Sequence, residues 1–193
     1  MMAQSQQEDR INYGAKKFSM WIFILTSMLL FAGFSSAFIV YSGGKGHGLD
    51  VIMPRAFMYS TMVIITSSLT LFLASRAAKQ SQPEKQRLFL WLTFFLGIAF
   101  FAVQIYAWYV LAYKMDVHFT DPNASRAFIY VFSGMHLLHV IAALLVLLNT
   151  IISTYRNTTQ ARNLFKMEMT SIFWHFLDII WIYLYVFLLL NQY

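Results

Sequence analysis

The sequence predicts an all-α membrane protein, a bundle of five transmembrane helices with its N-terminus inside and its C-terminus outside. Hydrophobic residues make up 59% of the 193 residues and charged residues 11%, whereas soluble domains carry roughly 25% charged residues. The apolar residues also gather into five long runs that short polar segments separate. A chain of this composition cannot cover itself with a wetted surface, so we expect the bilayer to be its solvent.

Each of the five runs is long enough to cross about 30 Å of hydrocarbon, which takes about 20 helical residues. The runs do not show the alternation of β-barrel strands, so we expect helices. The first run is too long for a signal-peptide core, and we expect it to be retained. The expected helices lie near residues 18–41, 56–77, 88–113, 127–153 and 171–190. They form one membrane domain of residues 16–193, which follows a polar tail of residues 1–15.

Polar, glycine and proline residues separate these helices in order. The glycine-rich residues 42–48 form a turn after the first helix, and Pro54 precedes the second at a position that tolerates proline. Breaks at residues 80–84 and 121–125 precede the third and fourth helices, and we expect a polar loop over residues 155–166 before the fifth.

The distribution of Lys and Arg predicts the orientation. Segments on the N-terminal side of the membrane carry ten of the 14 Lys and Arg residues, and those on the other side carry four. The positive-inside rule therefore places the N-terminus inside. These cations sit in short loops and form no basic stripe along a helix, which argues against nucleic-acid binding. The absence of cysteine excludes disulfides and cysteine-bound metal centres.

Few ionisable residues lie within the expected helices. His136 and His139 are three residues apart on the fourth helix, as are His175 and Asp178 on the fifth. Residues at this spacing share a helix face, and ionisable groups at membrane depth are functional candidates. A rise of about 1.5 Å per residue places His139 and Asp178 at similar depth. We therefore expect Asp178 to pair with a histidine of the fourth helix or with His175.

Four interpretations of these groups are haem ligation, a proton relay, a metal site, or an interhelical hydrogen-bond cluster. The sequence favours the cluster, because no ligand set with metal-like spacing accompanies the histidines and no ionisable chain continues outward. Haem ligation, for example by His136 with His175, stays an alternative. We expect Gln104 and Asn149 to bond across helices. We expect the tryptophans near helix ends to anchor them at the membrane interface, namely Trp21, Trp91, Trp108 and Trp174.

Two motifs resemble a known family. Residues 174–185 (WHFLDIIWIYLY) closely resemble the W-H-F-x-D-x-x-W-x-F-L-Y signature of haem–copper oxidase subunit III. Residues 133–140 (SGMHLLHV) resemble its G-x-H-x-x-H-V motif, and residues 17–23 resemble the start of its first shared helix. The resemblance spans roughly residues 16–190 and attaches a structural role to a set of motif residues: Gln104, His136, His139, Glu168, Trp174, His175, Asp178 and Trp181.

The resemblance implies a non-catalytic subunit III of a proton-pumping cytochrome c oxidase, which reduces oxygen to water in the bacterial inner (cytoplasmic) membrane. It implies no catalytic, cofactor or metal residue on this chain, because haem and copper belong to partner subunits. It further implies direct contact with subunit I, membership of a complex with subunits II and IV, bound phospholipid and support of proton uptake. An electron-donor complex is a further candidate partner.

Two alternatives stay in the family, namely subunit III of a quinol oxidase and an accessory subunit of nitric oxide reductase. A third is of another class, a small haem b membrane anchor that uses His136, His139 and His175 as ligands. The chain also departs from the family pattern, with Ser27 and Ala107 where many members carry carboxylates. A role attached to those carboxylates does not transfer to this chain.

Overall fold

A computed structural model describes the backbone of residues 2–45, 49, 51–119, 124–156 and 159–192. Side chains are described over residues 13–43, 49, 51–119, 125–156 and 159–192. Of the turn expected at residues 42–48, residues 46–48 lie outside these ranges, and residues 42–45 are helical. Of the break expected at residues 121–125, residues 121–123 lie outside them, and residues 124 and 125 already belong to a helix.

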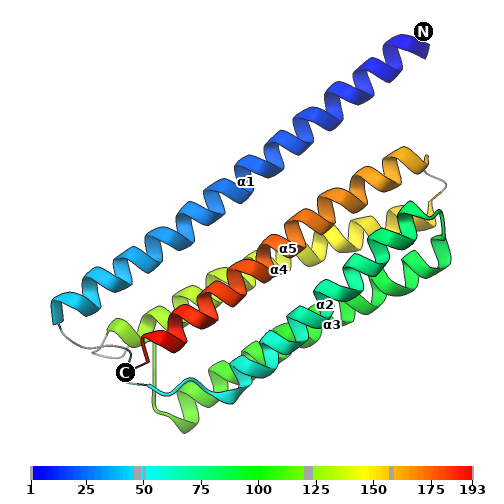
Figure 1. Ribbon diagram of the computed structural model, residues 1–193. Helices are drawn as coiled ribbons and strands as arrows, with labels where there is room; N and C mark the ends of the chain where they lie inside the picture. Colours follow the sequence, from blue (N-terminus) through cyan, green and yellow to red (C-terminus); the bar gives the residue numbers. More distant parts are fainter. Residues whose placement is uncertain (1, 46–48, 50, 120–123, 157–158, 193) are drawn as a thin grey trace.

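Five long helices make up the described chain (Figure 1). All five are long and apolar enough to cross a membrane, which confirms the predicted number of spans. Their bounds are α1 Met2–Lys45, α2 Arg55–Lys79, α3 Pro83–Tyr109, α4 Ala124–Tyr155 and α5 Gln160–Leu190, and a π-helical turn, η1 Val110–Lys114, extends α3.

The helices are longer than the apolar runs that predicted them. α1 already begins at Met2, and the expected polar loop before the last helix is wrong from residue 160 onward, because α5 starts at Gln160. Hydropathy marks only the part of a helix in hydrocarbon, whereas the 31 residues of α5 extend over about 46 Å. That length matches a bilayer of about 40–45 Å including its headgroup regions, so polar residues at the helix ends continue the helix into the interface.

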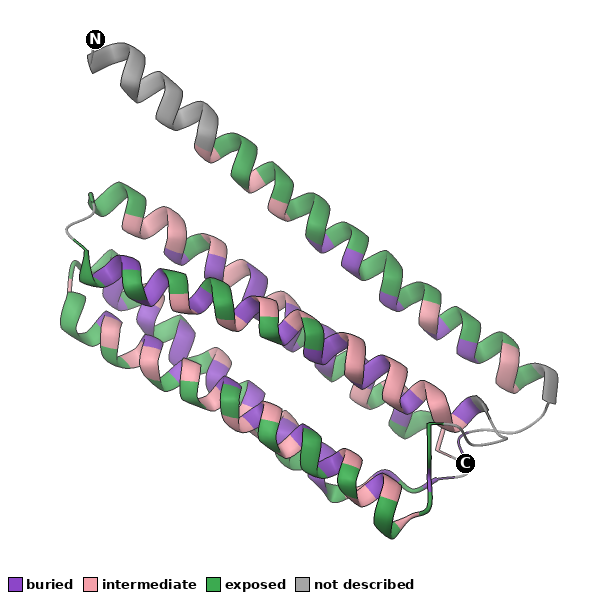
Figure 2. Ribbon diagram, turned by 180° about the vertical axis from the view of Figure 1, so that it is seen from behind, coloured by how far each residue is buried: buried purple, intermediate pink, exposed green. Residues whose placement is uncertain are grey.

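Four of the helices form a closed ring and the fifth lies outside it. α2 packs on α3, α3 on α4, α4 on α5 and α5 back on α2. Over the described residues, α1 packs only on α4 and α5, and both views show it along the side of the ring (Figures 1 and 2). Buried residues face the ring interior, while most of α1 is exposed (Figure 2). This exposure suits a chain whose outer surface meets lipid or other subunits.

Aromatic rings fill the centre of the ring of helices. Trp181 of α5 stacks on Phe57 of α2 with ring centroids 6.0 Å apart, and it meets Phe100 of α3 edge-on at 5.0 Å. His136 of α4 lies 5.0 Å from the same indole. One tryptophan therefore contacts an aromatic side chain from each of the other three helices of the ring, and such contacts stabilise packing beyond the area they bury.

Gly97 of α3 allows a close approach to side chains of α4 and α5. A Cβ atom at this position would lie 2.8 Å from Leu144 of α4 and 2.9 Å from the Trp174 ring of α5. Leu144 has a flexible side chain, but the indole of Trp174 is held by a hydrogen bond to Ser67. A side chain at residue 97 therefore displaces α5 from α3.

We predict that Gly97→Ala destabilises the bundle by about 1–3 kcal/mol, the usual cost of overpacking a well-packed core. Gly33→Ala is the matched control, because a Cβ atom there meets nothing within 4 Å. Unfolding of both variants in the same detergent measures the difference. Equal stability of the two variants would contradict the close packing at Gly97.

Candidate functional site

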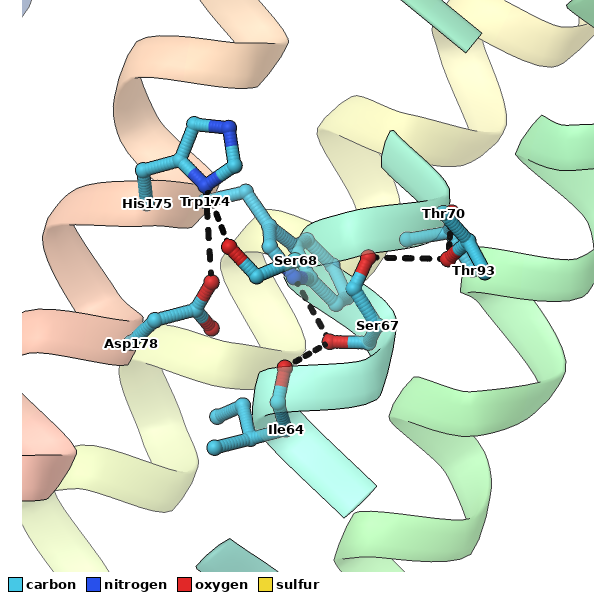
Figure 3. A network of polar contacts seen from close by, with 8 residues as sticks. All are labelled: Ile64, Ser67, Ser68, Thr70, Thr93, Trp174, His175 and Asp178. Atoms are coloured by element: carbon cyan, nitrogen blue, oxygen red, sulfur yellow. Dashed lines mark hydrogen bonds and ion pairs between the residues drawn. The ribbon is translucent and has the colours of Figure 1, made fainter. Parts of the chain in front are cut away.

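The polar residues of α5 form a seam with α2 in the middle of the bundle. Trp174 Nε1 donates a hydrogen bond of 3.1 Å to Ser67 Oγ, and Trp181 Nε1 donates one of 3.1 Å to Thr61 Oγ1. Ser67 Oγ in turn donates to the carbonyl oxygen of Ile64 at 2.7 Å (Figure 3). Trp174 is buried in this seam, so its predicted place as an interface anchor is wrong.

His175 and Asp178 lie next to this seam (Figure 3). Asp178 is only 5% exposed, and its Oδ2 lies 3.6 Å from His175 Nδ1. The same Nδ1 is 2.7 Å from Ser68 Oγ of α2. Of the two partners expected for Asp178, the structure therefore supplies His175 on its own helix. The 3.6 Å contact is too long for a hydrogen bond, and neither carboxylate oxygen has a hydrogen-bond partner among the described residues.

His139 links α4 to α1. Its Nδ1 lies 2.8 Å from the carbonyl oxygen of Met135, and its Nε2 lies 3.2 Å from Ser27 Oγ. Since a carbonyl only accepts, Nδ1 carries the proton. The Ser27 hydroxyl itself donates to the carbonyl oxygen of Phe23 at 2.8 Å. Ser27, noted in the sequence only as a departure from the family pattern, is therefore a contact of a motif histidine.

His136 is fully buried among aromatic rings rather than beside His175. Its ring lies 6.4 Å from Phe31 and 5.9 Å from Phe100, in addition to its contact with Trp181. Neither of its ring nitrogens has a hydrogen-bond partner among the described residues. The structure does not show the pairing of His136 with His175 that the haem alternative requires.

Gln104 does not form the cross-helix bond expected from the sequence. Its side chain is fully buried, but neither amide atom has a hydrogen-bond partner among the described residues. It lies on α3 one turn from Phe100, which contacts His136, and one turn from Trp108, which donates to Ser133 of α4. Gln104 therefore lies at the α3–α4 contact as a buried amide. The bond from Trp108 to Ser133 also shows that Trp108 joins two helices, beyond the anchoring role expected for it.

Glu168 of α5 forms an ion pair with α1. Its Oε1 lies 2.6 Å from Lys17 Nζ of α1, and both side chains are about half exposed. Exposed ion pairs contribute about 0–1 kcal/mol, so this contact positions α1 against α5 more than it stabilises the fold.

Sequence reasoning missed several polar contacts between helices. Hydroxyl pairs join α2 to α3 and α4 to α5, and reciprocal amide bonds join α3 to α5: Thr70–Thr93 at 2.8 Å, Thr150–Thr170 at 2.7 Å, and Gln86–Asn163 at 3.1 and 3.0 Å. Small and polar residues within apolar helices commonly mark helix contacts. That signal was present in the sequence, but it did not identify the partners.

These contacts hold helices together. Within the part of the chain that the structure describes, no group of three or more His, Cys, Asp or Glu side chains is placed to hold a metal ion. Fold and site together define an integral membrane protein whose intramembrane polar residues serve mainly helix packing.

Comparison with known proteins gives the family. A family model described as cytochrome c oxidase subunit III matches residues 4–192, almost the whole chain. The chain belongs to this family and is a membrane subunit III of a haem–copper respiratory oxidase.

Relatives of two kinds are similar to this chain. Cytochrome c oxidase subunit 3 of Alkalihalophilus pseudofirmus is 28% identical, over 89% of this chain and 85% of the relative. Cytochrome bo(3) ubiquinol oxidase subunit 3 of Pseudomonas aeruginosa is 30% identical, over 88% of this chain and 81% of the relative. Cytochrome c oxidase subunit 3 of Bacillus sp. PS3 is also 30% identical, over 89% and 84%.

We predict that Ser67→Ala lowers the free energy of unfolding by about 0.6–1.7 kcal/mol, because the buried Trp174 indole loses its acceptor. Thr66→Val is the control, since the exposed Thr66 hydroxyl bonds only to the carbonyl oxygen of Met62 on its own helix. Unfolding in detergent, monitored by tryptophan fluorescence, compares the two. A larger loss for Thr66→Val than for Ser67→Ala would contradict the assignment.

Proposed function

We propose that this chain is the non-catalytic subunit III of a proton-pumping cytochrome c oxidase, where it stabilises subunit I, binds phospholipid and supports proton uptake. The observation that carries the proposal is that the motif residues form contacts with other side chains inside the bundle. Trp174, Trp181 and His139 bond to hydroxyls of neighbouring helices, and Asp178 lies against His175. These residues join the helices of the bundle, so the part in proton uptake is an indirect one, through subunit I.

Cytochrome c is the proposed electron donor, and quinol is the alternative. Both kinds of oxidase subunit are among the relatives at similar identity, so the donor follows from the partner subunits. A dinuclear copper site in subunit II of the purified complex would support cytochrome c. A subunit II without that copper would favour quinol, and a partner that reduces nitric oxide would favour an accessory subunit of that enzyme.

The haem b anchor is a weaker proposal, because the histidines it needs are engaged or enclosed. His139 has both ring nitrogens next to partners, and His175 has Nδ1 next to Ser68. His136 is enclosed by Phe31, Phe100 and Trp181. A haem between these helices would have to displace the rings that form the core.

The proposed orientation places the N-terminus inside, in a bacterial inner membrane. Lys16 of α1 and two cations of α5, Arg162 and Lys166, line one cavity and therefore lie at one end of the bundle. This clustering supports the charge asymmetry of the sequence. Relatives from bacteria support the choice of membrane.

The same end of the bundle offers a site for an anionic phospholipid. Lys16, Arg162 and Lys166 line a cavity of about 300 Å³ that Tyr13 and Asn149 complete. An apolar groove of about 390 Å³ between α1, α4 and α5 shares Val146 and Met169 with this cavity. Cations at the interface attract anionic headgroups, and the groove next to them suits an acyl chain.

We predict that the triple variant of Lys16, Arg162 and Lys166 to Gln retains several-fold less anionic phospholipid in the purified complex, because the headgroup loses its counter-charges. Lys79→Gln with Lys85→Gln is the control, since these cations lie at the end of α2 and the start of α3, away from the cavity. Mass spectrometry of co-purified lipid measures the ratio. Equal lipid in both variants would contradict the site.

We predict that Asp178→Ala loosens the subunit from the complex while the haem content of subunit I is preserved, because His175 loses its neighbour within the membrane. Asp178→Asn keeps the volume of the side chain and should retain more of the subunit. The amount of this chain per haem in the purified complex measures both. Loss of turnover in a fully assembled complex would instead indicate a direct chemical role for Asp178.

A further inference from the structure

His175 lies within the apolar, membrane-crossing segment of α5. It is the central residue of α5, Gln160–Leu190, and its partner Ser68 lies close to the centre of α2, Arg55–Lys79. His175 lies four residues, about 6 Å, inside the apolar segment of residues 171–190.

The imidazole has one nitrogen inside the bundle and one outside. Nδ1 faces Ser68 and Asp178, while the second ring nitrogen points away from both (Figure 3). The side chain is 34% exposed. No residue that the structure describes forms a hydrogen bond with Nε2.

An exposed ring nitrogen at this depth needs a partner from outside the chain. Nε2 is a donor or an acceptor in every protonation state of the ring, and hydrocarbon supplies neither. Ionisable residues within membrane spans almost always face the protein interior or a polar partner. In the isolated chain, His175 Nε2 faces outward and has no polar partner among the described residues. A second protein that covers His175 would supply that partner.

The surface around His175 is otherwise apolar. Ile179, Ile182 and Val186 continue its stripe along α5, with Ile179 66% exposed. Ile65 and Phe72 are exposed on α2 one turn to either side of Ser68. α5 itself contacts both α1 and α2, and Figure 1 shows it between them. An apolar face with one polar atom at its centre matches the pattern of a transmembrane helix contact.

We propose that the α2–α5 face around His175 is the docking site for a transmembrane helix of the partner subunit, and that a hydroxyl, amide or carboxyl side chain of that helix bonds to His175 Nε2. The inference rests on the proposed function as an assembled subunit and assigns one face of the bundle to that assembly. The Ser68 and Asp178 contacts hold the ring so that Nε2 faces the partner.

Two substitutions of His175 separate its inner contact from its outer contact. Asn places a polar atom near the position of Nδ1 and none near Nε2, while Gln places one near Nε2. We expect His175→Asn to leave the unfolding temperature of the chain close to wild type and to weaken its retention in the complex about three- to twenty-fold, the range for one interhelical hydrogen bond. His175→Gln should recover part of that retention.

Two bulky substitutions test the α2–α5 face without changing the hydrogen bond of His175. Ile179→Trp adds bulk one turn from His175, and Leu145→Trp adds it on α4, where Leu145 is 63% exposed and α2 makes no packing contact. Titration of the solubilised complex with detergent, followed by the fraction of this chain that stays with the large haem-containing subunit, measures retention for each. We expect Ile179→Trp to detach the chain at lower detergent than Leu145→Trp.

The outcomes separate this inference from the proposed function. Detachment by Leu145→Trp with full retention of His175→Asn and Ile179→Trp would overturn the docking site while leaving the subunit assignment intact. A wild-type chain that never purifies with a haem-containing subunit would overturn the proposed function itself. Equal retention of all variants in an assembled complex would also overturn the docking site.

Discussion

The fold depends on one constraint, which is that polar groups within hydrocarbon must find their partners inside the protein. The contact of Trp174 with Ser67 and that of Trp181 with Thr61 meet this constraint between α5 and α2. The contact of His139 with Ser27 meets it between α4 and α1. Apolar packing alone distinguishes poorly between helix faces in lipid, whereas these bonds specify which helix lies against which.

This constraint also connects structure to function. In this chain, many polar groups within the membrane form contacts between helices. Such contacts fix the arrangement of the helices and therefore the shape of the outer surface. There are exceptions: Gln104, His136 and Asp178 have no side-chain hydrogen bond within the described residues, and part of the His175 imidazole faces outward. The outward-facing imidazole is the observation on which the proposed docking of a partner helix rests.

The sequence predicted the five helices and the family because both depend on local patterns. Apolar length identifies a span, and the spacing of His136, His139, His175 and Asp178 forms motifs. It did not predict that Trp174 bonds to Ser67 or that Gln104 lacks a hydrogen bond. A periodic pattern shows which face of a helix a residue occupies, but the depth and register of two helices decide which hydroxyl meets which ring. Hydropathy likewise missed the polar start of α5 at Gln160.

Haem content per copy tests most directly whether this chain is a scaffold rather than a redox subunit. The chain would be purified in mild detergent by a tag, together with the subunits that accompany it, and the haem measured before and after the large partner is removed. Our account predicts that haem scales with the large subunit and leaves with it. Haem that stays with this chain after removal of the partner would contradict the account and identify histidines of α4 and α5 as ligands.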